Sequence, residues 1–192
     1  MTLREGLRPG GRSARVQESV HQATQALLAE GGRDALTVPQ IAARAGVTPS
    51  TIYRRWGDLP QLLADVALQR MRPDSGPLDT GGLHSDLQAW VDQYLEEMSS
   101  APGRAMLRDV LAATDGGQAS SQCAGITRAQ IEQILERARA RGEPAPPAAL
   151  LMERVVAPIV YSMLFDAVPL DLAYGRALLE GCLQAPAGIQ DN

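Results

Sequence analysis

The chain has 192 residues, a formal net charge of −4 at neutral pH and only two cysteines. Its length fits one ordinary domain, or a small domain joined to a larger one. No run of about 18 apolar residues lacks charges, and no basic segment precedes an apolar one at the N-terminus. We therefore expect neither a membrane span nor a secretion signal, and a cytoplasmic location. Cys123 and Cys182 lack metal-ligand spacing, so buried free thiols are expected, with a redox switch as the alternative.

The charge is unevenly distributed along the chain. Residues 1–60 contain eight arginines and five acidic residues, whereas residues 61–192 contain ten arginines and seventeen acidic residues. A basic first part on an acidic remainder favours contact of the first part with a polyanion such as DNA. Every basic side chain is an arginine, so each cationic phosphate contact would use a planar guanidinium group.

The chain opens with an arginine-rich, glycine-rich segment. Residues 1–12 are expected to form a flexible arm, with a minor-groove contact as the alternative. Residues 13–30 then repeat apolar side chains at helical spacing and end at a pair of glycines. This pattern predicts a first amphipathic helix.

Residues 37–56, TVPQIAARAGVTPSTIYRRW, have the pattern of two short helices joined by a tight turn. Thr37 and Gln40 have the spacing of a capping box, and Gly46 can take the left-handed backbone that ends the first helix. Thr48 is a good N-cap for the second helix, whose first residue is a proline. This layout indicates a helix-turn-helix, whose second helix enters the DNA major groove. An ordinary helical hairpin with a solvated basic face is the alternative.

The second short helix has distinct inner and outer faces. Ile52 and Trp56 lie four residues apart and are expected to point inward. The remaining hydroxyl, phenol and guanidinium groups suit phosphate oxygens and base edges. The candidate DNA contacts are Thr37, Thr48, Ser50, Thr51, Tyr53, Arg54 and Arg55.

A third capped helix follows directly. Asp58 and Gln61 have capping-box spacing ahead of a helix predicted from Leu59 to Met71. The run AEGGRDALTVPQIAARAGVTPSTIYRRW with the Leu62-Leu63 pair after it resembles the N-terminal domain of TetR-family transcriptional regulators. The resemblance covers about residues 13–70.

The resemblance implies an all-α fold in two parts. An N-terminal three-helix helix-turn-helix domain at 13–58 would bind DNA, and a connector helix at 59–71 would lead to a helical effector-binding and dimerisation domain at 72–192. Thr48, Ser50, Thr51, Tyr53 and Arg54 match the family's recognition helix, and Thr37 matches the start of the helix before it. Arg55 falls where the family often has histidine or another polar contact, and Trp56 matches a core aromatic. Leu59 stands where many members have a lysine, so the resemblance does not extend to that phosphate contact.

The remaining chain also has helical periodicity. Helices are predicted from Leu83 to Met98, around Met106 to Leu111 and from Ile131 to Ala138, with residues 115–125 as a loop or frayed start. Residues 148–165 form a largely apolar helix in which a proline should produce a kink. A last helix rich in small residues follows.

Large apolar side chains on these helices are candidates for an effector pocket, and core packing is the alternative for each. The candidates are Trp90, Tyr94, Met98, Met106, Val110, Met152, Tyr161 and Met163. Gln93, Arg108 and Asp109 are polar groups that could orient a ligand.

The last two helices are apolar enough to suggest a four-helix bundle between two subunits, and TetR-like proteins dimerise through their last two helices. The alternative is that both helices are core within one subunit. The candidate interface residues are Val156, Ile159, Val160, Leu172, Leu179 and Leu183.

The sequence therefore predicts a ligand-responsive DNA-binding regulator, in the family's usual role of repressor. Its partners would be a double-stranded palindromic operator, a second copy of the chain and a small apolar or aromatic effector, with no membrane and no cofactor. A DNA-binding dimer regulated by a protein partner, or acting without a ligand, is the alternative. An enzyme is not expected, because neither His21 nor His84 has an acid at catalytic spacing, and no catalytic or metal-binding motif occurs.

Overall fold

The computed structural model describes residues 11–72, 74–165 and 170–184, and the regular structure in these ranges is helical. This confirms the predicted all-α class. The predicted arm falls mainly on residues 1–10, outside the described residues. The elements are α1 (Gly11–Gly31), α2 (Val38–Ala45), α3 (Pro49–Trp56), α4 (Leu59–Met71), α5 (Leu83–Ser99), α6 (Ala101–Leu111), α7 (Gln118–Ala140), α8 (Ala148–Leu151), the π-helical turn η1 (Met152–Val156), α9 (Ala157–Phe165) and α10 (Leu172–Gln184).

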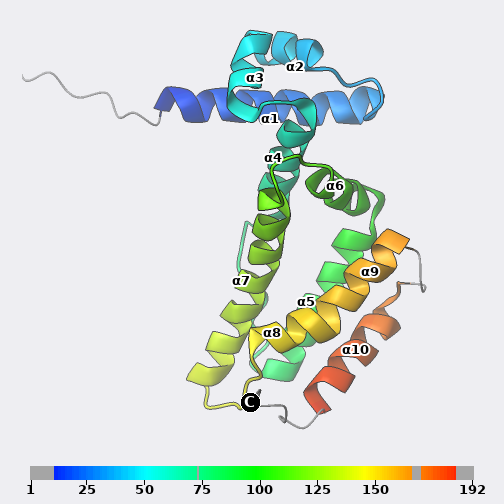
Figure 1. Ribbon diagram of the computed structural model, residues 1–192. Coiled ribbons are helices and arrows are strands. Elements are labelled where there is room, and N and C mark those ends of the chain that lie inside the picture. The colour runs from blue at the N-terminus through cyan, green and yellow to red at the C-terminus, as the bar shows by residue number, and fades with distance from the viewer. Residues whose placement is uncertain (1–10, 73, 166–169, 185–192) are drawn as a thin grey trace, which may run out of the picture.

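The helices form a small head on an elongated body (Figure 1). The head consists of α1, α2 and α3, and α4 leads from it into the body. The body contains α5 and α7 to α10, and α6 lies between the two parts. The head has its own apolar core, which includes Val20, Ile41, Ile52 and Leu62.

Local sequence signals explain the helix ends in the head. The capping box at Thr37 and Gln40 is formed, and Gly46 ends α2 in the left-handed conformation with φ of 68°. Thr48 occupies the N-cap position of α3, but its hydroxyl makes no bond to the helix backbone. Asp58 accepts a hydrogen bond from the Gln61 backbone at 2.9 Å, so α4 begins as predicted.

Helix α7 starts earlier than the sequence pattern indicated. Residues from Gln118 onward, predicted as a loop or frayed start, belong to α7. The two glycines before it have positive φ and make the turn. Asp115 then accepts hydrogen bonds from the backbone of Gly117 at 3.1 Å and Ala119 at 2.8 Å. This aspartate substitutes for a side-chain N-cap, which explains why small polar residues begin a long helix here.

The predicted kink at Pro158 takes the form of a π turn just before it. Within Met152–Val156 the backbone hydrogen bonds span five residues instead of four, and the Ala157 N–H donates to the Met152 carbonyl. Proline has no N–H to donate and its ring clashes with the preceding turn, so regular α bonding cannot continue through this point.

The segment Ala148–Phe165 is long and apolar enough to cross a membrane by length and composition alone. Its inward side chains Leu151, Val155 and Ile159 are 2%, 0% and 0% exposed and belong to the body core. One side of this segment therefore packs against the body core.

Candidate nucleic-acid interface and effector cavity

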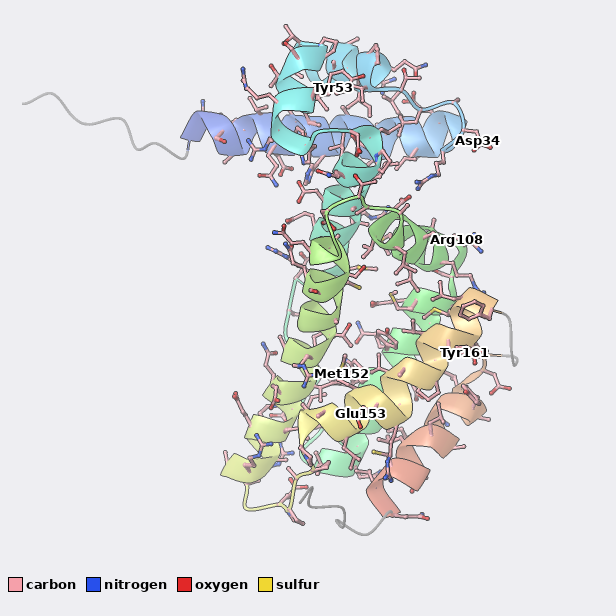
Figure 2. The ribbon with its side chains drawn as sticks, in the orientation of Figure 1. Asp34, Tyr53, Arg108, Met152, Glu153 and Tyr161 are labelled. Atoms are coloured by element: carbon pink, nitrogen blue, oxygen red, sulfur yellow. The ribbon has the colours of Figure 1, made fainter. Side chains whose placement is uncertain are left out.

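The outer face of α3 is exposed and polar. Tyr53 is 50% exposed, and Arg54 beside it is exposed as well. Ile52 and Trp56 are 1% and 6% exposed, because they pack into the core of the head. Their inward packing fixes the rotation of α3, and Tyr53 lies on the outer side of the head (Figure 2).

Hydroxyl groups gather at the start of α3. Thr48 Oγ1 lies 2.9 Å from Ser50 Oγ and 3.0 Å from Thr51 Oγ1. A cluster of hydroxyls beside the free N–H groups of a first helical turn is suited to a phosphate. Thr37 is exposed at the start of α2, where its hydroxyl donates to Gln40 Oε1 at 2.7 Å.

Arg55 differs from the other predicted DNA contacts, because its guanidinium is already bound within the head. It donates to the Ser13 carbonyl at 3.0 Å, to the Ser13 hydroxyl at 2.7 Å and to Gln17 Oε1 at 2.6 Å. The Arg55 Cζ atom also lies 5.2 Å from the centroid of the Trp56 ring. The geometry argues against the predicted direct contact and makes Arg55 a brace between α3 and the start of α1.

A carboxylate that the sequence analysis overlooked joins three helices of the head. Asp65 Oδ2 on α4 lies 2.9 Å from His21 Nε2 on α1 and accepts a hydrogen bond from Trp56 Nε1 on α3 at 2.7 Å. Burial raises the pKa of Asp65, but the hydrogen bonds from His21 and Trp56 more than offset this, so the pKa lies below the usual value. The available signal was an aspartate between the apolar residues Ala64 and Val66 of α4, together with a histidine on α1.

A cavity of about 750 Å³ lies in the body between α4, α5, α6, α7 and the η1–α9 segment. Its wall is mainly apolar, which suits an apolar or aromatic molecule. The predicted pocket residues that line it are Trp90, Tyr94, Met98, Met106, Val110 and Met152.

Two predicted pocket residues are wrong. Tyr161 is 59% exposed on the outside of α9, and Met163 is 3% exposed within the body core. Val160 lines the cavity instead. Successive helical residues point about 100° apart, so Val160 and Tyr161 cannot face the same side.

The polar candidates also separate. Gln93 lines the cavity, whereas Arg108 and Asp109 do not. Arg108 lies on the exposed side of α6 (Figure 2). Asp109 is buried and forms an ion pair with Arg33, which comes from the loop between α1 and α2.

Both cysteines are free thiols. Cys123 lines the cavity, with its sulfur 3.7 Å from Met71 Sδ, and burial raises its pKa. Burial also raises the pKa of Cys182, which is 2% exposed. Both thiols are therefore protonated and poorly reactive near neutral pH.

Three predicted dimer-interface residues are wrong. Val156, Ile159 and Leu179 are 5%, 0% and 1% exposed within one subunit, because they pack into the body core. A side chain that is covered inside its own chain cannot also pack against a partner. For these positions, the alternative of core packing within one chain is correct.

The exposed apolar surface of the last two helices lies elsewhere. Tyr161 and Phe165 are 59% and 66% exposed, and their ring centroids are 4.8 Å apart. Leu172 and Leu183 on α10, which were predicted for the interface, are partly exposed. This face carries apolar side chains that nothing in the described part of the subunit covers.

Two polar links join the head to the region around α6. One is the Arg33–Asp109 ion pair. In the other, the Thr114 hydroxyl donates to Asp58 Oδ2 at 3.0 Å and accepts from Gln61 Nε2 at 3.2 Å. Since α6 also lines the cavity, the same helix contacts both the cavity and the head.

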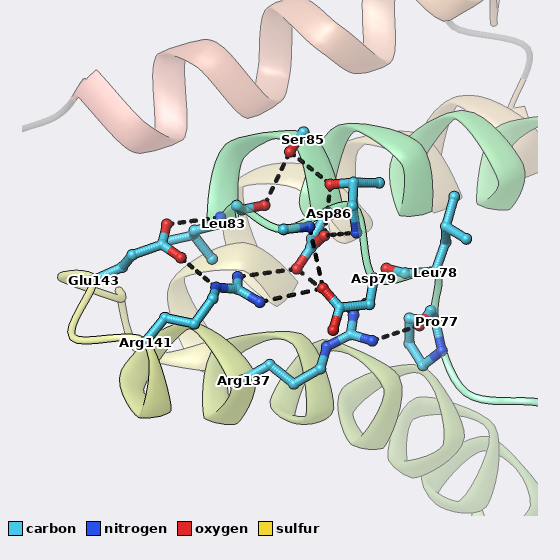
Figure 3. Close-up of polar contacts among 12 residues, drawn as sticks. Pro77, Leu78, Asp79, Leu83, Ser85, Asp86, Arg137, Arg141 and Glu143 are labelled. Carbon is cyan, nitrogen blue, oxygen red and sulfur yellow. Dashed lines mark hydrogen bonds and ion pairs between the residues drawn. The ribbon is translucent and has the colours of Figure 1, made fainter.

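A fully buried carboxylate organises the far end of the body (Figure 3). Asp86 on α5 accepts hydrogen bonds from the Thr80 backbone at 2.6 Å, the Thr80 hydroxyl at 2.7 Å and Arg141 at 3.1 Å. Arg137 on α7 lies 3.7 Å away and donates to the carbonyls of Pro77 and Leu78, each at 2.8 Å. The network fastens the loop after α4 to α5 and α7.

Both parts of the chain match known protein families. Residues 21–66 match the model of bacterial regulatory proteins of the tetR family, and residues 77–181 match the tetracyclin repressor-like C-terminal domain. The HTH-type transcriptional regulator AqdR of Rhodococcus erythropolis is 31% identical over 141 residues, which cover 72% of this chain and 68% of that protein.

Solved structures agree with the fold. The TetR family transcription regulator SCO0332 has a TM-score of 0.70 and 25% identity, with 88% of this chain and 97% of that chain covered. SmeT, the repressor of the Stenotrophomonas maltophilia multidrug efflux pump SmeDEF, has a TM-score of 0.53 and 23% identity, with 91% and 96% covered.

Proposed function

Because this chain belongs to the TetR family of bacterial transcriptional regulators, we propose that it is a homodimeric repressor of a palindromic operator, released by a small apolar or aromatic effector. It is a regulator and not an enzyme. The proposal is carried by one observation: an outward polar face on α3 and an apolar cavity of about 750 Å³ are joined through α4 and α6. Such a regulator acts where the DNA is, in the cytoplasm.

We assign DNA reading to residues 13–58, with 59–71 as the connector and 72–192 as the effector and dimer part. Tyr53 and Arg54 would contact the major groove and its phosphates. A guanidinium group can fork onto guanine or phosphate, and a phenol can donate to phosphate. Hydroxyl groups would bind the phosphate backbone of the DNA; they belong to Thr37, Thr48, Ser50 and Thr51.

A second copy of the chain is the proposed occupant of the exposed face of α9 and α10. One recognition helix reads only a few base pairs, so a regulator with a single head would have low specificity. Two heads related by a twofold axis read an inverted repeat. Exposed Tyr161 and Phe165 supply aromatic surface of the kind enriched in subunit interfaces, and Leu172 and Leu183 extend it.

Release would follow from a change in the separation of the two heads. An effector in the cavity touches α6, and α6 contacts the head through Asp109 and the following Thr114. A hundredfold loss of operator affinity requires the effector to favour the released state by about 3 kcal/mol. Repression is the role named for SmeT, whose fold is similar.

Selection of bound oligonucleotides from a random pool tests the DNA-reading and dimer parts together. We expect an inverted repeat, and binding to it that weakens steeply with salt because phosphate contacts release counterions. A single half-site, or no enriched sequence, would contradict the proposal.

Variants of two arginines test whether α3 is the DNA-contacting helix. Arg54→Ala is expected to weaken operator binding about tenfold or more, as loss of a base or phosphate fork does. Arg44→Ala is the matched control, because Arg44 lies on α2 and is paired with Glu30 at 2.7 Å. It should leave operator affinity within about twofold of wild type, since it removes the same charge away from α3. Equal effects of both changes would indicate a nonspecific charge contribution.

The alternative is a DNA-binding dimer that responds to a protein partner or to no ligand. The cavity favours a ligand sensor. Thermal shift against a panel of apolar and aromatic compounds separates the two, because ligands that bind only the folded state stabilise it.

A further inference from the structure

The amide of Gln130 has a fixed orientation in the cavity wall. Trp90 Nε1 donates to Gln130 Oε1 at 2.8 Å. An indole N–H is only a donor, so the amide oxygen and not the amide nitrogen must face Trp90. The two amide hydrogens of Gln130 therefore belong to the other side of the group.

Those amide hydrogens are free to serve a ligand. Gln130 lines the cavity, and within the described ranges its amide nitrogen donates to no other residue. The nearby polar groups are already paired, because Thr127 donates to the Cys123 carbonyl at 3.4 Å and bonds to the Tyr94 hydroxyl. The Gln130 amide nitrogen is therefore an available donor in the cavity lining.

The rest of the wall restricts the shape and charge of the ligand. Trp90 and Tyr94 are stacked, with ring centroids 5.1 Å apart and planes 22° from parallel, so they present a flat aromatic surface. The charged residues in the lining are exposed and stand at the rim: Arg70, Arg72, Asp74 and Glu97. A charged group placed deep in the cavity would lose its hydration without gaining a partner.

We propose that Gln130 is the specificity-determining residue of this cavity, and that the ligand is an uncharged planar aromatic molecule with a carbonyl-type acceptor. The acceptor receives the free Gln130 amide hydrogen while the ring system packs beside Trp90 and Tyr94. The inference rests on the proposed role of the cavity as the effector site. It adds one directional hydrogen bond to what would otherwise be selection by size and apolarity.

A pair of probes isolates that hydrogen bond. Fluorenone and fluorene have nearly the same planar tricyclic shape and differ in a single ring position, a carbonyl in one and a methylene in the other. Equilibrium dialysis against the full chain should give about tenfold tighter binding of fluorenone, the value of a typical net hydrogen bond. Equal affinity for the two probes, or no binding of either, would overturn the assignment.

Variants of Gln130 test whether the preference comes from its amide. Gln130→Glu keeps an acceptor for Trp90 but loses the donor when ionised, and Gln130→Met removes donor and acceptor while keeping the length. Both should reduce the fluorenone-to-fluorene ratio to near one. Gln133→Glu adds the same charge on the exposed side of α7 and should keep the tenfold ratio. Retention of the ratio in both Gln130 variants would refute the proposal.

This experiment contains no DNA, so its failure is distinct from failure of the proposed regulator. A chain that selects an inverted repeat but binds both probes equally keeps its proposed function and loses only the ligand class. A chain that prefers fluorenone but selects no operator keeps the ligand class and loses the regulatory role.

Discussion

The head and the body are each organised around one aspartate, and the two sites differ in burial and in partners. In the head, Asp65 is shared by α1, α3 and α4, and its side chain is 38% exposed. In the body, the Asp86 side chain is 0% exposed and contacts Thr80 of the loop after α4, Arg137 on α7 and Arg141 at the end of α7. Asp65 is held by the His21 imidazole, the Trp56 indole and, at 3.3 Å, the Gln17 amide, whereas Asp86 is held by hydroxyl, backbone and guanidinium groups.

Because of this difference, we expect Asp65 to control the orientation of α3 and Asp86 to control the stability of the body. Water can replace some of the hydrogen bonds that are lost when Asp65 is substituted. We therefore expect such a substitution to change the packing of α3 against α1 more than it lowers the stability of the protein. The Asp86 side chain has no solvent exposure, so loss of its charge removes the buried carboxylate partner of Arg137 and Arg141, although Asp79 and Glu143 still contact Arg141. We therefore expect substitution of Asp65 to affect the position of α3 more than stability, and substitution of Asp86 to affect stability more.

The largest effect is expected from Asp86→Asn. We expect the free energy of unfolding to fall by about 3 kcal/mol, because Arg137 and Arg141 lose their one fully buried carboxylate partner. Urea unfolding of full-length protein measures it. Asp79→Asn removes an exposed member of the same network and should cost much less. Similar losses for both variants would show that burial is not what distinguishes Asp86.

Asp65→Asn should have a smaller effect on stability and a clear one on DNA. The expected loss is about 1 kcal/mol, because the partly exposed site is screened by solvent. Operator affinity should fall several-fold, since Trp56 at the end of α3 loses its charged acceptor. A variant that binds the operator like wild type would remove the link between Asp65 and the pose of α3.

Acid should distinguish the two sites further. Asp65 and Asp86 both have pKa values below the usual range, so each adds stability that is complete above the pKa of the unfolded chain and is lost as pH falls through the folded pKa. Stability should be level from about pH 5 to 7 and decline below about pH 4. In Asp86→Asn the decline should be shallower. Parallel urea-midpoint curves for wild type and variant would contradict the assignment to Asp86.

The smallest effect is expected from Arg55→Ala. Loss of the brace should speed amide hydrogen exchange over the first turns of α1 and weaken operator binding a few-fold, with little change in unfolding. If Arg55 instead contacts DNA directly, affinity should fall as far as in Arg54→Ala, and exchange in α1 should stay as in wild type.

Much of the head could be predicted from the sequence because its signals are local. The capping residues at Thr37 and Asp58, the left-handed Gly46 and the inward spacing of Ile52 and Trp56 act within one or two helical turns. The bonds from Arg55 to Ser13 and Gln17 join residues about forty positions apart, and no local pattern announces them.

The body could be predicted only in part, because apolar spacing does not tell a cavity wall from a core or an interface. Ile159, Val160 and Tyr161 are consecutive apolar residues, yet one packs in the core, one lines the cavity and one is exposed. Which face each takes depends on the π turn before them, whose position the sequence did not specify beyond the proline.

That π turn holds one residue more than an ordinary helical turn can accommodate. Deleting a single residue within Met152–Val156 would restore uninterrupted α spacing and turn everything after it by about 100° about the helix axis. Tyr161 and Phe165 would then point in a different direction, and a partner bound to them would change its orientation by the same rotation. In the proposed dimer, the angle between the two DNA-binding heads would therefore change with the length of this helix, and Val160 would at the same time turn away from the cavity.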